Sequence, residues 1–179
     1  MGTRHLVAVV KDGENKVAQY GQWDGYPSGQ GLSVLIFLNG DGNIGRLTES
    51  IDRVRFLDED GVDKDMMESY DKNAPEWSSD PDNRTEDQKY WFKNYISRDL
   101  GAEILENVAS SSDAEIILRD SSSFAEDHLF CEYAYIINLD TNSLAVYCGG
   151  TDPAKEYDLS SLPTDEVFIS DLEENDDEE

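Results

Sequence analysis

The sequence predicts an α+β domain, in which an antiparallel sheet built from an N-terminal and a C-terminal hairpin is covered on one face by two to four helices. Short β-type runs flank turn residues near both ends of the chain, and apolar residues recur at helical spacing between them. The length of 179 residues fits one domain, which we place at residues 1–164. An acidic, disordered tail is expected at residues 165–179.

The first hairpin is predicted from an apolar run at residues 6–10, turn residues at 12–15 and an alternating segment at 16–22. A loop rich in glycine and aromatic residues follows, which we call the 23–29 loop. Residues 30–39 then predict a short buried helix. A buried strand is the alternative, because so short an apolar run does not define a period.

The middle of the chain predicts helices on either side of an insertion. Apolar residues at helical spacing predict a helix over 45–57. Residues 58–88 show no clear period, so we expect a surface insertion there. Near its end, Thr85 and Gln88 have the spacing of a reciprocal helix capping box. A further helix is predicted over 97–108, with a serine as its N-cap.

The clearest β pattern is the C-terminal hairpin, with strands at 130–139 and 144–147 joined by turn residues at 140–143. Shorter strands are predicted at 115–119 and 167–169. Alternation along the hairpin predicts one buried face. That face would carry Cys131, Tyr133, Tyr135, Ile137, Leu139, Leu144, Val146 and Cys148.

The register of this hairpin bears on the two cysteines. If Leu139 pairs with Leu144, then Cys148 lies opposite Tyr135 and is separated along the strands from Cys131. A disulfide requires closely placed Cα atoms. We therefore expect two free, buried thiols.

Charge limits the classes of partner. The chain has 40 acidic and 14 basic residues, a net charge of −26 and a pI near 4.1. Direct nucleic-acid binding is excluded, because affinity for phosphates comes from Lys and Arg. An anionic membrane surface is disfavoured for the same reason. The negative field instead favours a basic protein partner, although acidic composition also serves solubility alone.

The 23–29 loop is the first candidate site. Its aromatic faces could stack on a planar ligand, and its glycine amides, placed before a helix start, could bind an anion. The candidate residues are Trp23, Asp24, Gly25, Tyr26, Ser28 and Gly29. The alternative is a structural loop, in which the two aromatic side chains fill the core and the carboxylate bonds backbone amides.

Three charged residues are candidates for the same cleft. Arg4 would either receive an anionic ligand or pair with Asp24 across the mouth of the hairpin. Arg98 and Glu132 are the other two candidates. In an enzyme, Asp24 would act as an acid or base or orient the substrate, and Tyr26 would stack on it.

No cofactor, metal site or catalytic set is predicted. The two histidines, His5 and His128, lie far apart in the sequence, and the acidic loops lack the spacing of a helix–loop–helix calcium site. An N-terminal nucleophile is disfavoured, because removal of Met1 would expose Gly2.

Several segments, in one order, carry a resemblance. They are the opening Met1-Gly2-Thr3-Arg4, the residues 19–31 around the loop, and the segments 97–105, 131–140 and 144–147. With them the chain resembles a family of small proteins of phages, bacteria and some fungi that has no established activity. The resemblance spans most of residues 1–150 and implies a shared fold and a shared pocket. The acidic tail and the 58–88 insertion are peculiar to this chain.

Two functions remain open. The first is a non-enzymatic, acidic binding protein, phage-encoded if the resemblance holds, that engages a basic surface of a host protein with nucleic-acid-like charge. The second is a small-molecule-binding protein or enzyme with its site at the 23–29 loop. A cytoplasmic location is expected, because the chain lacks a secretory signal and an apolar run near the roughly 18 residues of a membrane span. The oligomeric state is not predicted.

Overall fold

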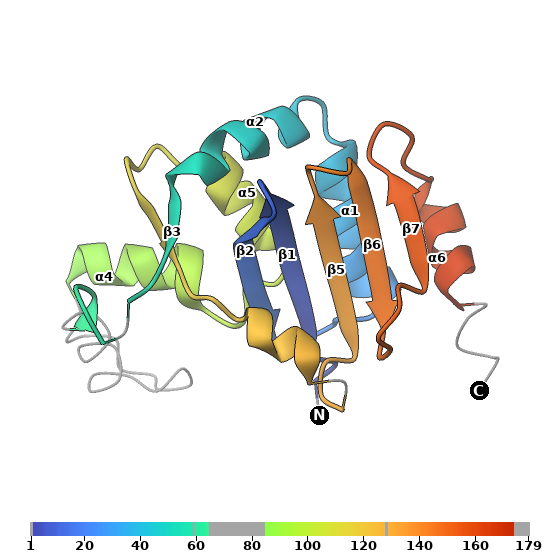
Figure 1. Ribbon diagram of the computed structural model, residues 1–179, viewed down its shortest axis with the longest axis horizontal. Helices are drawn as coiled ribbons and strands as arrows, with labels where there is room; N and C mark the ends of the chain where they lie inside the picture. The colour runs from blue at the N-terminus through green and yellow to red at the C-terminus, as the bar shows by residue number, and fades with distance from the viewer. Residues whose placement is uncertain (1, 59, 65–84, 128, 174–179) are drawn as a thin grey trace.

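The computed structural model describes residues 2–58, 60–64, 85–127 and 129–173 (Figure 1). A five-stranded sheet lies at its centre, in the order β2-β1-β5-β6-β7. Its strands are β1 (His5–Lys11), β2 (Glu14–Gly21), β5 (Tyr133–Asn138), β6 (Ser143–Cys148) and β7 (Lys155–Asp158). A second, two-stranded sheet pairs β3 (Val54–Phe56) with β4 (Ile116–Leu118) in parallel.

The helical segments complete the α+β class that the sequence predicts. The α-helices are α1 (Leu32–Asn39), α2 (Asn43–Ser50), α4 (Glu86–Trp91), α5 (Glu103–Ala109) and α6 (Asp165–Glu173). Shorter helical turns are η1 (Pro27–Gly31), η2 (Ile51–Arg53), η3 (Phe92–Ile96) and η4 (Ser122–Glu126). No helix among the described residues is long and apolar enough to cross a membrane.

Both predicted hairpins are present, but the sheet that they form is mixed. The β1–β2 and β5–β6 pairs are antiparallel, and β7 extends the second hairpin. The hairpins meet where β1 and β5 pair in parallel, with His5 opposite Tyr133 and Val10 opposite Asn138. This central pairing joins strands more than 120 residues apart in the sequence. No turn residues connect the two strands directly, so a local sequence pattern does not predict the pairing.

The register of the C-terminal hairpin differs from the prediction by two residues. Ile137, not Leu139, lies opposite Leu144. The Asn138 side chain fixes this earlier turn, because its Oδ1 accepts hydrogen bonds from the backbone N–H of Asp140 at 3.0 Å and of Thr141 at 3.2 Å. A shift of two residues leaves the side chains of the paired strands β5 and β6 on their predicted faces. Both cysteines are free, as expected, and Cys131 is buried, but Cys148 is only half-buried.

Two predicted helices have different bounds. The helix expected over 45–57 ends as α2 at Ser50, and β3 begins four residues later. The Arg53 guanidinium ties that segment to the chain entering β4, since its Nη2 donates to the Ser111 carbonyl at 2.9 Å. The helix expected over 97–108 begins only at Glu103, because Gly101 has φ of +49° and interrupts it.

The capping box that begins α4 is confirmed. The Thr85 N–H donates to Gln88 Oε1 at 2.9 Å, and the Gln88 N–H donates to Thr85 Oγ1 at 3.2 Å. Much of the predicted insertion, residues 65–84, lies outside the described residues.

The C-terminal segment corrects two predictions. Residues 165–173 form α6 in place of the expected strand at 167–169 and of a disordered tail. Phe168 and Leu172 are spaced four apart and are both buried, so α6 belongs to the domain. The Phe168 ring lies 5.5 Å from that of Tyr157 on β7. The remainder of the predicted tail, 174–179, is outside the described residues.

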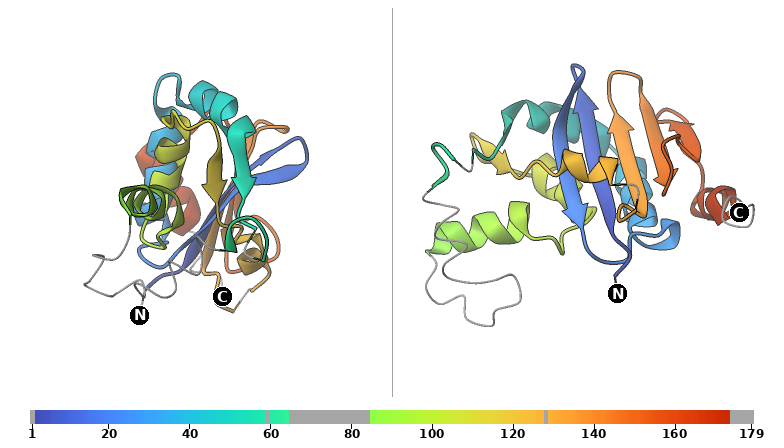
Figure 2. Two further views of the ribbon diagram at one scale, coloured as in Figure 1. Left: turned by 90° about the vertical axis from the view of Figure 1, so that its left-hand side faces the viewer. Right: turned by 60° about the horizontal axis from the view of Figure 1, so that its bottom comes forward.

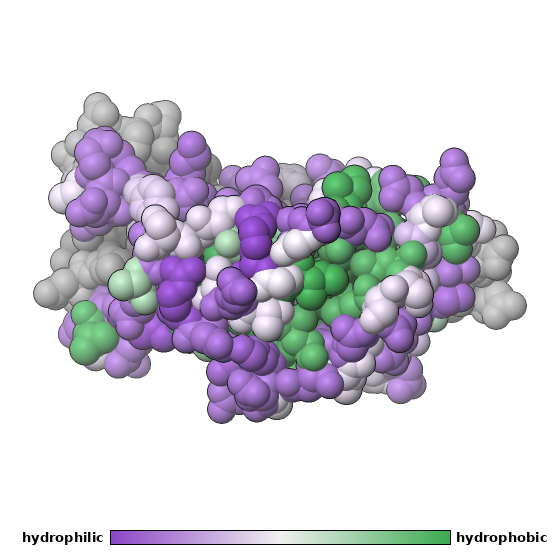
Figure 3. Space-filling view, turned by 90° about the horizontal axis from the view of Figure 1, so that it is seen from above, coloured by the Kyte–Doolittle hydropathy of each residue, from purple (hydrophilic) through white to green (hydrophobic). Residues whose placement is uncertain are grey.

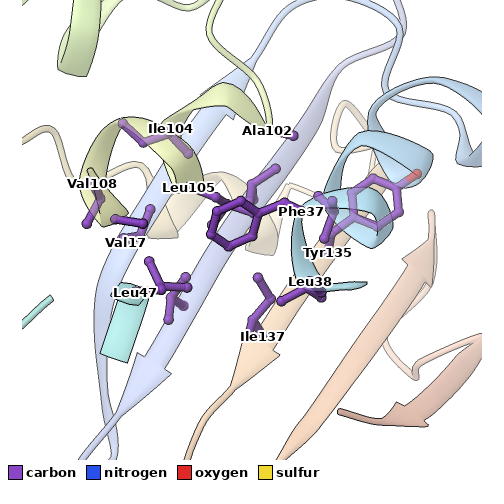
Figure 4. Close-up of a cluster of buried hydrophobic side chains, with 14 of the residues drawn as sticks. Val17, Phe37, Leu38, Leu47, Ala102, Ile104, Leu105, Val108, Tyr135 and Ile137 are labelled. Carbon is purple, nitrogen blue, oxygen red and sulfur yellow. The ribbon is translucent and has the colours of Figure 1, made fainter. Parts of the chain in front are cut away.

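The main core lies between the sheet and the larger helices. Figure 2 shows these helices on one side of the sheet and η4 on the other. In Figure 4, side chains of α1, α2 and α5 meet those of the strands. The labelled residues are Val17, Phe37, Leu38, Leu47, Ala102, Ile104, Leu105, Val108, Tyr135 and Ile137. The upper side of the molecule, seen in Figure 3, has hydrophobic side chains near its middle, bordered by hydrophilic ones.

The opposite face of the sheet carries a smaller apolar cluster. Leu6 and Ala8 of β1 lie there with Cys131 and Ala134, beside Phe124 and Ala125 of η4 and Ile136 and Tyr147 of the second hairpin. Cys131 therefore lies on the face opposite to the one predicted. The sheet is apolar on both faces near η4, so the prediction of a single buried side is wrong there.

Candidate functional site

The inner side of the 23–29 loop is anchored to the sheet. The Gly25 N–H donates to the Thr3 carbonyl at 2.9 Å, and the Tyr135 hydroxyl donates to the Gly25 carbonyl at 2.7 Å. A Cβ on Gly25 would lie 2.7 Å from the Thr3 carbonyl oxygen, so the chain can approach this closely only as glycine. Asp24 has φ of +58°, which turns the chain toward η1.

The outer side of the loop presents aromatic side chains and carboxylates to solvent. Trp23 is 49% exposed and Tyr26 is 40% exposed. Trp23 Nε1–H donates to Asp99 Oδ1 at 3.0 Å, and the Tyr26 hydroxyl donates to Asp24 Oδ1 at 3.3 Å. The alternative of a loop whose aromatic side chains fill the core is therefore wrong. The negative field of Asp24 raises the pKa of the Tyr26 hydroxyl.

Ser28 and Gly29 lie within η1, the helical turn that precedes α1. Ser28 is exposed, and the Gly29 N–H donates to the Tyr26 carbonyl at 2.9 Å within the η1 turn. This amide is occupied inside the protein, so it is not part of an anion cradle.

Arg4 pairs with Glu132 and not with Asp24. Its Nε lies 3.8 Å from Glu132 Oε1, and its backbone N–H donates to the same oxygen at 3.0 Å. The guanidinium carbon lies 4.6 Å from the centre of the Phe130 ring, within the range of a cation–π contact. The parallel β1–β5 pairing brings these residues together. Arg4 and Glu132 lie far apart in the sequence, so no local pattern predicted their ion pair.

Arg98 lies next to the loop through its backbone and also lines a separate cavity. Its carbonyl accepts a hydrogen bond from the Gln22 N–H at 3.2 Å, just before Trp23. That cavity is polar and has a volume of about 190 Å³. The cavity is lined by Gln19, Tyr20, Ile96, Arg98, Arg119 and Ser121. The predicted single cleft with Arg4, Glu132 and Arg98 is thus divided between two places.

His5 is a buried histidine beneath the loop. Neither imidazole nitrogen has a hydrogen-bond partner that meets the distance and angle limits among the described residues, and a Cβ on Gly21 would lie 2.0 Å from the ring. Burial lowers the pKa of His5 to about 4, and the nearby Thr3 backbone and the Asp24 charge oppose this shift only partly. The ring is therefore neutral at physiological pH and acts as a packing element under the loop.

An apolar cavity of about 200 Å³ lies on the sheet face that carries η4. Its walls are Ala125, Cys131, Ala134, Ile136, Tyr147, Gly149, Gly150 and Thr151. Burial raises the pKa of the Cys131 thiol to about 11, and the charges of Asp127 and Glu132 add to this effect. Sequence reasoning missed this cavity. The sequence analysis placed Ala134 on the face opposite to the larger apolar residues of the strand but inferred no cavity there.

The described residues hold no cluster of three or more His, Cys, Asp or Glu side chains that could bind a metal ion. No protein-family model, curated protein or solved structure matches the chain. The resemblance to the phage, bacterial and fungal family therefore stays a prediction.

Proposed function

We propose that this protein is a non-enzymatic binding protein that engages a basic surface of a partner protein through the 23–29 loop. The net charge of −26 is the observation that carries the proposal, because such a field speeds encounter with cationic partners. Two exposed aromatic side chains, each of which donates a hydrogen bond to a carboxylate, form a contact surface within that field.

The pairing of aromatic and carboxylate groups fits the side chains of Lys and Arg. A cation over the Trp23 or Tyr26 ring gains a cation–π contact, and Asp99 or Asp24 supplies an ion pair beside it. Trp and Tyr are also enriched among the residues that dominate binding at protein interfaces. The anchored glycine backbone beneath the loop holds these groups in place, which lowers the entropy cost of binding.

The test uses nona-arginine as a defined basic probe. We expect it to bind the wild type by isothermal titration, with affinity falling at least about tenfold between low and high salt. Trp23→Ala should weaken binding, whereas Ile36→Ala, which removes an exposed apolar side chain from α1, serves as the matched control. Binding that is equal in the two variants, or no binding at low salt, contradicts the proposal.

A second candidate is a small-molecule site, favoured by the polar cavity that Arg98 and Arg119 line beside Tyr20. Two arginines at one cavity of a strongly acidic protein suit an anionic metabolite. A thermal-shift screen tests this candidate, because a ligand that binds only the folded state raises the unfolding midpoint. Midpoints that do not move with any anionic metabolite count against it.

A further inference from the structure

Two cavities adjoin at the edge of the sheet that β2 forms. The smaller one is the polar cavity of about 190 Å³ described above. The larger one has a volume of about 370 Å³ and is lined by Tyr20, Asp120, Ser121, Ser123, Phe124 and Asp127. Tyr20 and Ser121 line both cavities, so the two open beside each other around these residues. Figure 1 shows η4, which carries Phe124, beside the end of β2.

The two cavities carry charges of opposite sign. Arg98 and Arg119 line the smaller cavity, whereas Asp120 and Asp127 line the larger one. Within the described chain, no acidic residue lines the smaller cavity and no basic residue lines the larger one. We call the two together the bipolar groove, because it has a positive end, an aromatic middle at Tyr20 and a negative end. The larger cavity alone reaches the roughly 300–1,000 Å³ of sites for small organic ligands.

Contacts within the protein hold the walls of the bipolar groove in place. The Ser121 N–H donates to a backbone carbonyl of β2 at 3.0 Å. Gln19 Nε2 donates to the Ser97 carbonyl at 3.1 Å, so the segments before and after the two arginines are tied to the same strand. The Tyr20 ring lies 4.8 Å from the Phe124 ring, edge to face. A groove whose walls the fold already holds costs little conformational entropy when a ligand binds.

The carboxylates of the negative end are positioned by backbone donors. The Ser122 N–H donates to Asp120 Oδ1 at 2.9 Å, and the Phe130 N–H donates to Asp127 Oδ1 at 3.2 Å. Asp120 is exposed and Asp127 is half-buried. Each of these hydrogen bonds uses one carboxylate oxygen, and a carboxylate can accept further hydrogen bonds through both of its oxygens.

We propose that the bipolar groove binds a small zwitterion whose carboxylate and ammonium groups are several bonds apart, as in a short peptide with free termini. The carboxylate meets Arg98 and Arg119, and the ammonium group meets the carboxylates of the negative end. This inference rests on the small-molecule candidate at the same two arginines and names its ligand class.

Two further arguments favour a long zwitterion. A zwitterion has no net charge, so the net charge of −26 does not repel it as it repels a simple anion. A free α-amino acid does not suit the groove, because it carries both charged groups on one carbon, whereas the two arginines and the two aspartates line different cavities.

Three probes that share one backbone but differ in their charged ends test the proposal: triglycine, N-acetyl-triglycine and triglycinamide. By isothermal titration at pH 7 we expect triglycine to bind at least about tenfold more tightly than triglycinamide, which lacks the carboxylate. It should bind about fivefold more tightly than N-acetyl-triglycine, which lacks the ammonium group. Equal affinities for triglycine and either of the other probes would overturn the proposal.

Charge variants assign the two ends of the groove separately. Arg98→Gln should reduce the preference for triglycine over triglycinamide and leave its preference over N-acetyl-triglycine. Asp120→Asn keeps an oxygen for the Ser122 N–H and should have the converse effect. Arg119→Gln and Asp127→Asn repeat the test from the other two lining residues if a first variant fails to fold. A folded variant that changes both preferences alike would overturn the assignment of the ends.

The matched control is Lys155→Gln, which removes a positive charge from β7 at the opposite edge of the sheet and should leave all three affinities unchanged. If N-acetyl-triglycine binds as tightly as triglycine, the zwitterion proposal is wrong and the anion candidate stands. If neither binds, both are wrong. The binding of nona-arginine and its loss in Trp23→Ala decide the function at the 23–29 loop independently of these results.

Discussion

The imidazole of His5 is buried against the backbone of Gly21 and Gly25, and this burial predicts a stability that depends on pH. Gly21 and Gly25 leave the space that the ring occupies, and the Tyr135 hydroxyl holds the loop above it. The sequence predicted the loop and its exposed candidates from local composition. It did not predict that His5 lies beneath the loop. The contact between His5 and Gly25 forms only because the backbone turns at Asp24, and no local pattern announces that turn.

The first prediction concerns His5. Its pKa is about 4 in the folded state against 6.5 in the unfolded chain, so its neutral form favours the fold. The stability is fully present above pH 6.5 and is lost as the pH falls toward 4, by at most about 3 kcal/mol. Urea unfolding between about pH 6.5 and pH 5 should show a steeper loss in the wild type than in His5→Leu. Parallel slopes would refute this account of the histidine.

The second prediction concerns the anchored glycine of the loop. In Gly25→Ala the new Cβ would meet the Thr3 carbonyl oxygen at 2.7 Å and the His5 Cβ at 2.8 Å. We expect the free energy of unfolding to fall by about 1–3 kcal/mol. Gly45→Ala on α2, where a Cβ would meet nothing within 4 Å, should instead raise it by about 0.5–1 kcal/mol. Chemical denaturation compares the two, and equal effects would show that close approach is not the reason for Gly25.

Individual elements were predictable wherever the signal is local. Both hairpins and the Thr85 capping box follow from turn and capping residues close in sequence. The parallel β1–β5 pair and the early end of α2 were not predictable, because each depends on a partner far along the chain. The helix α6 was not predicted, because its many acidic residues are typical of a disordered tail. The four-residue spacing of Phe168 and Leu172, which is typical of a helix, was nevertheless present in the sequence.

The third prediction tests whether α6 is part of the domain. Phe168 is fully buried against Tyr157, so Phe168→Ala should lower the free energy of unfolding by about 3–5 kcal/mol. The neighbouring Val167 is 50% exposed, and Val167→Ala should change it by at most about 0.5 kcal/mol. Denaturant midpoints measure both variants. A small effect at Phe168 would mean that α6 contributes little to the folded core.

At the scale of the whole molecule, the net charge of −26 is the main electrostatic property. Such a charge destabilises the compact state through self-repulsion. The charge itself could be predicted in full from the sequence. The sequence could not show that two exposed aromatic side chains would lie next to carboxylates, since Asp99 reaches Trp23 only in the folded chain.

The fourth prediction follows from this self-repulsion. Raising sodium chloride from about 20 mM to about 500 mM should raise the thermal unfolding midpoint, because the screening length shortens to a few ångströms. Most of the increase should occur at the low end of this range. Differential scanning calorimetry would contradict the account if the midpoint fell with salt.

The central claim, that the 23–29 loop receives cationic groups, is tested most directly by the indole N–H signals in a ¹H–¹⁵N spectrum during titration with nona-arginine. The Trp23 indole N–H donates a hydrogen bond to the exposed Asp99 carboxylate. The buried Trp91 indole N–H donates to the Ile117 carbonyl at 3.0 Å and serves as an internal control. We predict that the Trp23 signal shifts at low salt and returns when salt is added, while the Trp91 signal stays in place. A Trp23 signal that does not move when the peptide binds would contradict the claim.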